Sequence, residues 1–141
     1  MIKSKRIAGI YAVTIMMLST GIIYFVAASE TVSEISAESS ASVEMTLFVV
    51  SGCAYIAVGV WMAKIKGNRM SYMVAIVGSL ALIGLYFLSR TISLPIVGLQ
   101  EDVGTIDVLS KVLQIGIVAG SVYLLKQHKK YELIKNELKI N

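Results

Sequence analysis

Four long apolar runs decide what this chain can fold into. Three of them carry no charged side chain over about 20 residues, the helix length that crosses a hydrocarbon core of about 30 Å. The fourth has charged residues near its start and none from Val112 to Leu125. In lipid, only helices and closed barrels satisfy every backbone polar group, and barrel strands would alternate apolar and polar residues. We therefore predict an all-α polytopic membrane protein, one domain over residues 1–141, with transmembrane helices at about 7–28, 45–63, 70–89 and 106–125.

The composition supports this class and excludes several others. Hydrophobic residues make up 56% of the chain and charged residues 16%, against roughly 45–50% and 25% in soluble domains. The single Cys53 excludes an internal disulfide, a redox cysteine pair and a cysteine zinc site. The single His128 excludes paired haem ligands and a two-histidine metal site. No nucleotide-binding or zinc-protease motif is present. We therefore expect neither an enzyme nor a cofactor.

The basic residues predict the orientation of the four helices. Eleven of the thirteen Lys and Arg residues lie before the first run, between the second and third, or after the fourth. Because such residues stay on the cytoplasmic side, we expect both termini in the cytoplasm and two hairpins of the same orientation in the cell membrane. The alternative for residues 7–28 is a cleaved signal peptide, since a basic segment precedes them and small residues end them. The run is longer than the apolar part of a signal, which favours a retained helix.

Polar residues in the fourth run form the most informative cluster. Asp107, Lys111 and Gln114 are spaced four and three apart, so they share one helix face. Counting back from Leu125 at 1.5 Å per residue places Lys111 roughly 9 Å below the outer edge of the core. Asp107 is the expected partner of Lys111, and Arg90 at the outer end of the third run is a third member. Two interpretations compete: structural contacts between helices, or a site for a polar ligand or partner subunit.

The two outer connections predict different surfaces. Residues 29–44 are rich in Ser and Glu, with Glu30, Glu34 and Glu38 four apart, and we interpret them as a solvated loop. Residues 90–105 are apolar for a loop, and Pro95 disfavours helix there. We expect that second segment to lie in the membrane interface or to be partly re-entrant.

The segment SRTISLPIVGLQEDVGTIDVLSKVLQ, residues 89–114, resembles a group of uncharacterised small four-helix membrane proteins that are frequent in archaea. The resemblance depends on a Ser-Arg-Thr, Leu-Pro, Asp and Ser-Lys pattern and covers under a fifth of the chain. It suggests an archaeal source and carries no known activity. It marks Arg90, Pro95, Asp107 and Lys111 as positions of interest.

Two further features indicate contacts. Gly116 and Gly120 form a GxxxG pattern that permits close helix packing. The tail, residues 126–141, predicts an amphipathic helix near the anionic inner leaflet or against another subunit. Its candidate lipid contacts are Lys126, Lys129 and Lys130.

These features favour a non-catalytic subunit or assembly factor of a membrane complex. The partners would be an anionic inner leaflet and other membrane subunits or further copies of the chain, and not nucleic acid, because the basic residues adjoin apolar runs. The alternative is a small oligomeric transporter or channel for a polar or ionic solute. The small multidrug exporters have four helices of this length, but they need a carboxylate in their first helix, and residues 7–28 contain none.

Overall fold

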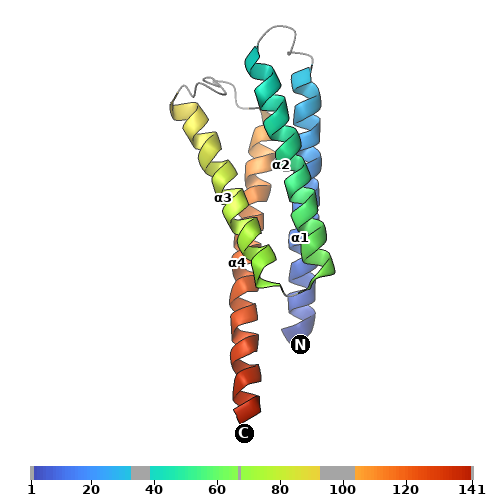
Figure 1. The fold of residues 1–141 in the computed structure, drawn as a ribbon, viewed down its shortest axis with the longest axis vertical. Coiled ribbons are helices and arrows are strands. Elements are labelled where there is room, and N and C mark those ends of the chain that lie inside the picture. Colours follow the sequence, from blue (N-terminus) through green and yellow to red (C-terminus); the bar gives the residue numbers. More distant parts are fainter. Residues whose placement is uncertain (1, 33–38, 67, 93–103, 141) are drawn as a thin grey trace.

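The computed structural model describes residues 2–32, 39–66, 68–92 and 104–140. They form four α-helices that lie side by side along one long axis (Figure 1). Each helix contains a stretch that is long and apolar enough to cross a membrane. The prediction of an all-α chain with four such helices is confirmed. The helices are α1 (Ile2–Val32), α2 (Ser39–Lys64), α3 (Arg69–Thr91) and α4 (Thr105–Ile140).

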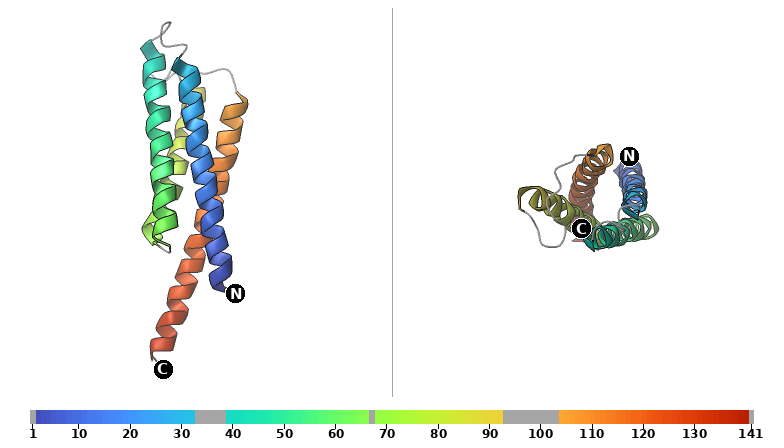
Figure 2. Two further views of the ribbon diagram at one scale, coloured as in Figure 1. Left: turned by 90° about the vertical axis from the view of Figure 1, so that its right-hand side faces the viewer. Right: turned by 90° about the horizontal axis from the view of Figure 1, so that it is seen from above.

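The helices pair as two hairpins that are joined through α1 and α4. Seen from above in Figure 2, they surround a common interior in chain order, with α4 beside both α3 and α1. Both termini lie at one end of the bundle, here called the terminal end. The opposite end, where α1 leads toward α2 and α3 toward α4, is the distal end.

All four helices are longer than the apolar runs that predict them, most of all α4. The predicted fourth helix and the predicted tail form one helix of 36 residues. Its last turns project past the other helices at the terminal end (Figures 1 and 2). A run of apolar residues marks only the part of a helix that suits lipid, and the backbone stays helical beyond it because its hydrogen bonds are local. The tail is therefore a continuation of α4 along the same axis.

The exterior of the bundle is apolar, and its interior contains polar side chains beside an apolar core, unlike a soluble protein. Among the described residues, the buried polar side chains are Thr14, Thr20, Thr31, Ser71, Ser79, Ser89, Ser110, Gln114 and Ser121. Several of the hydroxyls donate to carbonyl oxygens of their own helix, as Thr20 does to Met16 (2.8 Å). Large apolar side chains such as Val77, Phe87 and Ile115 are more than 60% exposed. This distribution fits a protein whose solvent is lipid.

Glycines bring α1 and α2 together more tightly than any apolar pattern predicts. A Cβ added at Gly21 would lie 2.7 Å from Ile56 Cγ1 and 3.0 Å from the Gly52 carbonyl oxygen. A Cβ at Gly59 would lie 3.3 Å from Met17 Cβ. Gly52 and Gly59 are seven residues apart and share a face, a signal that the sequence interpretation missed. They allow the two helix backbones to approach closely.

Helix α1 holds the bundle together. It contacts both α2 and α4, and it supplies four of the fully or nearly fully buried core side chains: Ile10, Val13, Met17 and Tyr24. Removal of residues 7–28 as a signal peptide would leave α2 and α4 without the helix that joins them.

Helices α2 and α3 contact each other least. In Figure 1, α3 leans away from α2 toward the distal end. The buried stripe of α3 consists of Ser71, Tyr72, Ala75, Ser79 and Ser89. The bundle is thus closed between α1 and α2 and more open between α2 and α3.

Candidate functional site

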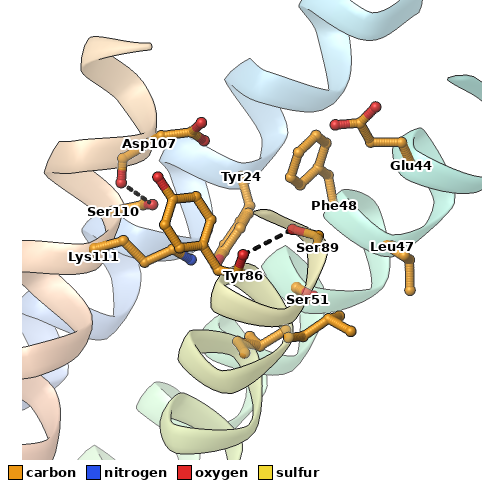
Figure 3. Close-up of a pocket in the computed structure, with 12 residues that line it drawn as sticks. Tyr24, Glu44, Leu47, Phe48, Ser51, Tyr86, Ser89, Asp107, Ser110 and Lys111 are labelled. Carbon is orange, nitrogen blue, oxygen red and sulfur yellow. Dashed lines mark hydrogen bonds between the residues drawn. The ribbon is translucent and has the colours of Figure 1, made fainter. Parts of the chain in front are cut away.

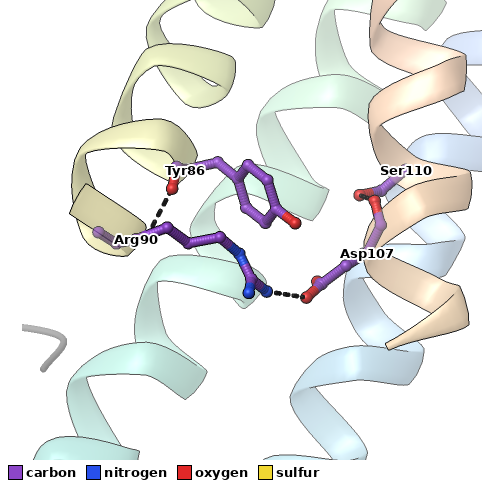
Figure 4. Close-up of polar contacts among 5 residues, drawn as sticks. Tyr86, Arg90, Asp107 and Ser110 are labelled. Carbon is purple, nitrogen blue, oxygen red and sulfur yellow. Dashed lines mark hydrogen bonds and ion pairs between the residues drawn. The ribbon is translucent and has the colours of Figure 1, made fainter. Parts of the chain in front are cut away.

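An ion pair joins α3 to α4 at the distal end. Arg90 Nη2 lies 3.2 Å from Asp107 Oδ2, and the two side chains are 17% and 32% exposed (Figure 4). Arg90 lies in the last turn of α3 and Asp107 in the first turn of α4. Each charge therefore complements the dipole of its own helix end.

The aromatic ring of Tyr86 lies beneath both cations of the cluster. Arg90 Cζ is 4.8 Å and Lys111 Nζ is 4.6 Å from the ring centroid. Rings at these distances attract cations through their quadrupole. Tyr86 is one helical turn before Arg90, but nothing in an apolar run distinguishes this tyrosine from one that faces lipid, so the sequence interpretation missed it.

Lys111 does not form an ion pair with Asp107, which corrects the expected partnership. Lys111 Nζ donates to Gln114 Oε1 at 3.2 Å. Among the described residues, no carboxylate oxygen lies within 4.0 Å of Lys111 Nζ. The guanidinium of Arg90 reaches the short Asp107 side chain from the neighbouring helix, and its planar donors suit a carboxylate. Lys111 instead donates to the side-chain amide of Gln114, one turn further along α4.

Gln114 extends the network across the bundle to α1. Its Nε2 donates to the Tyr24 hydroxyl at 2.6 Å, and the Gln114 side chain is completely buried. The Tyr24 ring stacks on the rings of Phe48 and Tyr55 of α2, with centroids 5.9 Å apart in both pairs. The sequence pattern placed Gln114 on the same face as Lys111 but did not indicate Tyr24 as its partner.

A second buried polar pair joins α2 to α3. The Tyr55 hydroxyl and Ser79 Oγ are 2.9 Å apart and buried. Through Tyr24 and Tyr55, the polar contacts connect all four helices. A buried donor and acceptor that satisfy each other avoid the cost of an unpaired polar group in lipid.

A cavity of about 80 Å³ opens among the four helices at the distal end (Figure 3). Lys111, Asp107 and Ser110 line its α4 side, and Glu44 and Phe48 its α2 side. The other lining residues are Tyr24, Leu47, Ser51, Leu82, Leu85, Tyr86 and Ser89. Of the four predicted cluster residues, Asp107 and Lys111 line the cavity. Gln114 contacts the cavity residue Lys111, and Arg90 contacts the cavity residue Asp107.

An apolar groove between α2 and α3 continues from this cavity toward the terminal end. Ser51 and Leu82 line both spaces. The groove has a volume of about 90 Å³, and its further walls include Val58 of α2 and Val74 of α3. A Cβ added at Gly78, another wall residue, would meet no heavy atom within 4 Å. The groove is therefore open at this position.

The other predicted site residues lie away from the cavity. Gly116 and Gly120 face α1: a Cβ at Gly120 would lie 2.5 Å from Val13 Cγ2, and one at Gly116 2.9 Å from Met16 Sδ. Lys126 and Lys129 line a hollow at the terminal end together with Arg69, and Lys130 is exposed beside them. Glu34, Glu38 and Pro95, like the apolar segment around Pro95, lie outside the described residues.

The described residues contain no group of three or more His, Cys, Asp or Glu side chains that could hold a metal ion. Comparisons with family models, with curated proteins and with solved structures found no match for this chain. The findings identify a small four-helix protein with four candidate membrane spans and no family.

Proposed function

We propose that this chain is a non-catalytic subunit or assembly factor of a complex in the cell membrane. The observation that carries the proposal is the exposed end of α4. Every residue from Tyr131 to Lys139 is exposed. Tyr131 lies beside α1, with its ring centroid 5.8 Å from Arg6 Cζ, and the last turns of α4 project beyond the other helices (Figure 1). Tyr131, Ile134 and Leu138 follow at spacings of three and four, so they form one apolar stripe on this helix.

The length of α4 favours a protein partner over lipid for this stripe. Leu138 lies 13 residues beyond Leu125, or about 20 Å along a helix that continues straight out of the hydrocarbon core. The headgroup region on each side of the core is only roughly 5–8 Å thick. The apolar stripe would therefore stand in water, where a second helix with a matching stripe would cover it. Lys126, Lys129 and Lys130 lie closer to the core and suit contacts with an anionic leaflet.

The test compares two variants that differ only in the face of α4 that they change. Ile134→Ser with Leu138→Ser removes the stripe, and Glu132→Ser with Asn136→Ser changes polar positions of the same segment. Each full chain is purified from its native membrane in mild detergent, and the mass and stoichiometry of its complex are measured. We expect a defined complex with the wild type and the control, and loss of the partner with the stripe variant. A chain that migrates alone in all three preparations would contradict the proposal.

The orientation is part of the same proposal, because a tail that binds a cytoplasmic partner must face the cytoplasm. The basic residues Lys64, Lys66 and Arg69 lie at the terminal end beside both termini, which supports cytoplasmic termini. The exposed Cys53 is first replaced by Ala. Single cysteines at Ser36 and Asn68 are then labelled in intact cells with an impermeant maleimide. We expect labelling at position 36 alone, and labelling at position 68 alone would reverse the orientation.

A transporter or channel for a polar solute is the second candidate, and the polar interior favours it. Among the described residues, the buried hydroxyls of Thr14, Tyr72 and Ser121 have no hydrogen-bond partner. They come from three different helices, and each is a group to which a polar solute inside the bundle could hydrogen-bond. Flux of ions or small polar solutes into proteoliposomes that contain only this chain would favour this candidate. The resemblance of residues 89–114 to uncharacterised membrane proteins adds no activity to either proposal.

A further inference from the structure

The cavity at the distal end contains a cation, Lys111, that forms no ion pair within 4.0 Å among the described residues. Asp107 is paired with Arg90 at 3.2 Å, which leaves Lys111 with an amide oxygen and an aromatic face as its described contacts. Both are uncharged. An ammonium at this depth is costly unless an anion accompanies it. The charge on Lys111 therefore favours the binding of a negatively charged group in the cavity.

The opposite wall limits how much negative charge the cavity accepts. Glu44 lines the α2 side of the cavity (Figure 3). Its carboxylate repels a second negative charge and opposes a dianion more strongly than a monoanion. A phosphodiester, which carries one charge, suits this cavity better than free phosphate, which carries close to two at neutral pH.

The groove below the cavity supplies a place for an apolar chain. It begins at Ser51 and Leu82, which also line the cavity, and its walls are almost entirely apolar. It runs along the helices from the level of the charged cluster toward the middle of the bundle. That is the course of a lipid chain whose headgroup lies at the distal membrane surface.

The width of the groove distinguishes a lipid chain from a transmembrane helix. Helices α2 and α3 still contact each other, whereas an inserted helix would need a space of about 10 Å. The open position at Gly78 has room for side-chain or methylene atoms. If nothing filled this space, the side chains that line it would lose dispersion contacts. In a bilayer, the nearest atoms that can fill it are those of lipid chains.

We propose that this protein binds one phospholipid, with its phosphate at Lys111 and one acyl chain between α2 and α3. The site does not depend on the partner of the α4 tail, which lies at the other end of the bundle. Lys111 provides the charge, Tyr86 and Gln114 hold its side chain in place, and Gly78 leaves the groove open for the chain.

Native mass spectrometry of the full chain, delipidated in detergent, tests this site. Palmitoyl-oleoyl phosphatidylglycerol is titrated into the wild type and five variants. We expect one lipid bound to the wild type. Lys111→Met, which removes the charge, and Gly78→Leu, which fills the groove, should each weaken binding roughly tenfold, equivalent to about 1.4 kcal/mol.

Two matched variants serve as controls. Gly84→Leu adds the same side chain to α3 at another position where a Cβ meets no atom within 4 Å, but Gly84 does not line the groove. Lys126→Met removes a positive charge at the terminal end. Both should bind the lipid as the wild type does. Lys111→Arg keeps the charge and should retain most of the binding, which separates a charge effect from a folding defect.

Two further ligands distinguish the parts of the proposed site. Palmitoyl-oleoyl glycerol, which has the chains without the phosphate, should bind weakly, and inorganic phosphate should not displace the phospholipid. Equal binding of the glycerol lipid would overturn the role of Lys111. Displacement by inorganic phosphate would show a free-anion site. Unchanged binding to Gly78→Leu would show that the chain does not lie in the groove.

Discussion

The two interfaces of α2 differ sharply. Against α1, its glycines Gly52 and Gly59 allow backbone and side-chain atoms of the two helices to meet at van der Waals distance. Against α3, contact is sparse, and Gly78 faces open space. The same residue type therefore closes one interface and leaves the other open. The difference teaches that a glycine in a membrane helix indicates close packing only when another helix lies against its face.

A leucine at the closed interface should give the largest effect. In Gly52→Leu, the added Cβ would lie 3.1 Å from the Gly21 carbonyl oxygen and 3.3 Å from Phe25 Cε2, and the backbone oxygen cannot move aside alone. We expect a loss of roughly 3 kcal/mol or failure to fold. The measurement is the midpoint of thermal aggregation in detergent, followed by size-exclusion chromatography. Gly78→Leu, at the open interface, is the control and should melt as the wild type does. Equal losses in both variants would remove the distinction between the two interfaces.

The ion pair between α3 and α4 should give the next largest effect. Asp107→Asn and Arg90→Met each leave one charge without its partner, and each should cost about 1–3 kcal/mol at this shallow depth. The double variant removes both charges and should recover much of that loss. Thermal midpoints of the four proteins complete a double-mutant cycle. Strictly additive losses would show that the pair contributes nothing to the contact between α3 and α4.

The hydrogen bond between α4 and α1 should contribute less. Tyr24→Phe keeps the ring stacked on Phe48 and Tyr55 but removes the oxygen that accepts from Gln114. Hydrogen bonds between membrane helices average about 0.6 kcal/mol and reach about 1.7 kcal/mol. We expect a loss in this range, measured as above. The matched variant is Tyr11→Phe of the same helix, whose hydroxyl accepts from Lys66 at an exposed position, and it should have the smaller effect because that hydrogen bond is exposed. A Tyr24→Phe protein as stable as the wild type would mean that Gln114 finds another acceptor.

The sequence predicts the features that the lipid environment determines, and it misses those that depend on contacts between neighbouring helices. The four apolar runs predicted the four helices because a backbone in lipid has few alternatives. The spacing of Asp107, Lys111 and Gln114 predicted one shared face because helix periodicity is local. The sequence did not predict that Asp107 would pair with Arg90 and not with Lys111, since this depends on how closely α3 approaches α4. Tyr24 and Tyr86 were missed because an aromatic residue in an apolar run has the same pattern whether it faces lipid or a polar partner.

Replacement of Lys111 should give the smallest change in stability, and this result bears most directly on the comparison. Lys111→Met removes a hydrogen bond to Gln114 and a cation over the Tyr86 ring, which together stabilise by about 1–2 kcal/mol. It also removes the cost of holding an ammonium among helices without an ion pair among the described residues, and that gain opposes the loss. We expect a net change within about 0.5 kcal/mol in delipidated protein, in contrast to Asp107→Asn. Added phospholipid should then raise the thermal midpoint of the wild type more than that of Lys111→Met, because a ligand stabilises the folded state according to its affinity. If Lys111→Met without lipid were as unstable as Asp107→Asn, Lys111 would be a structural contact. That result would contradict the proposed lipid site between α2 and α3.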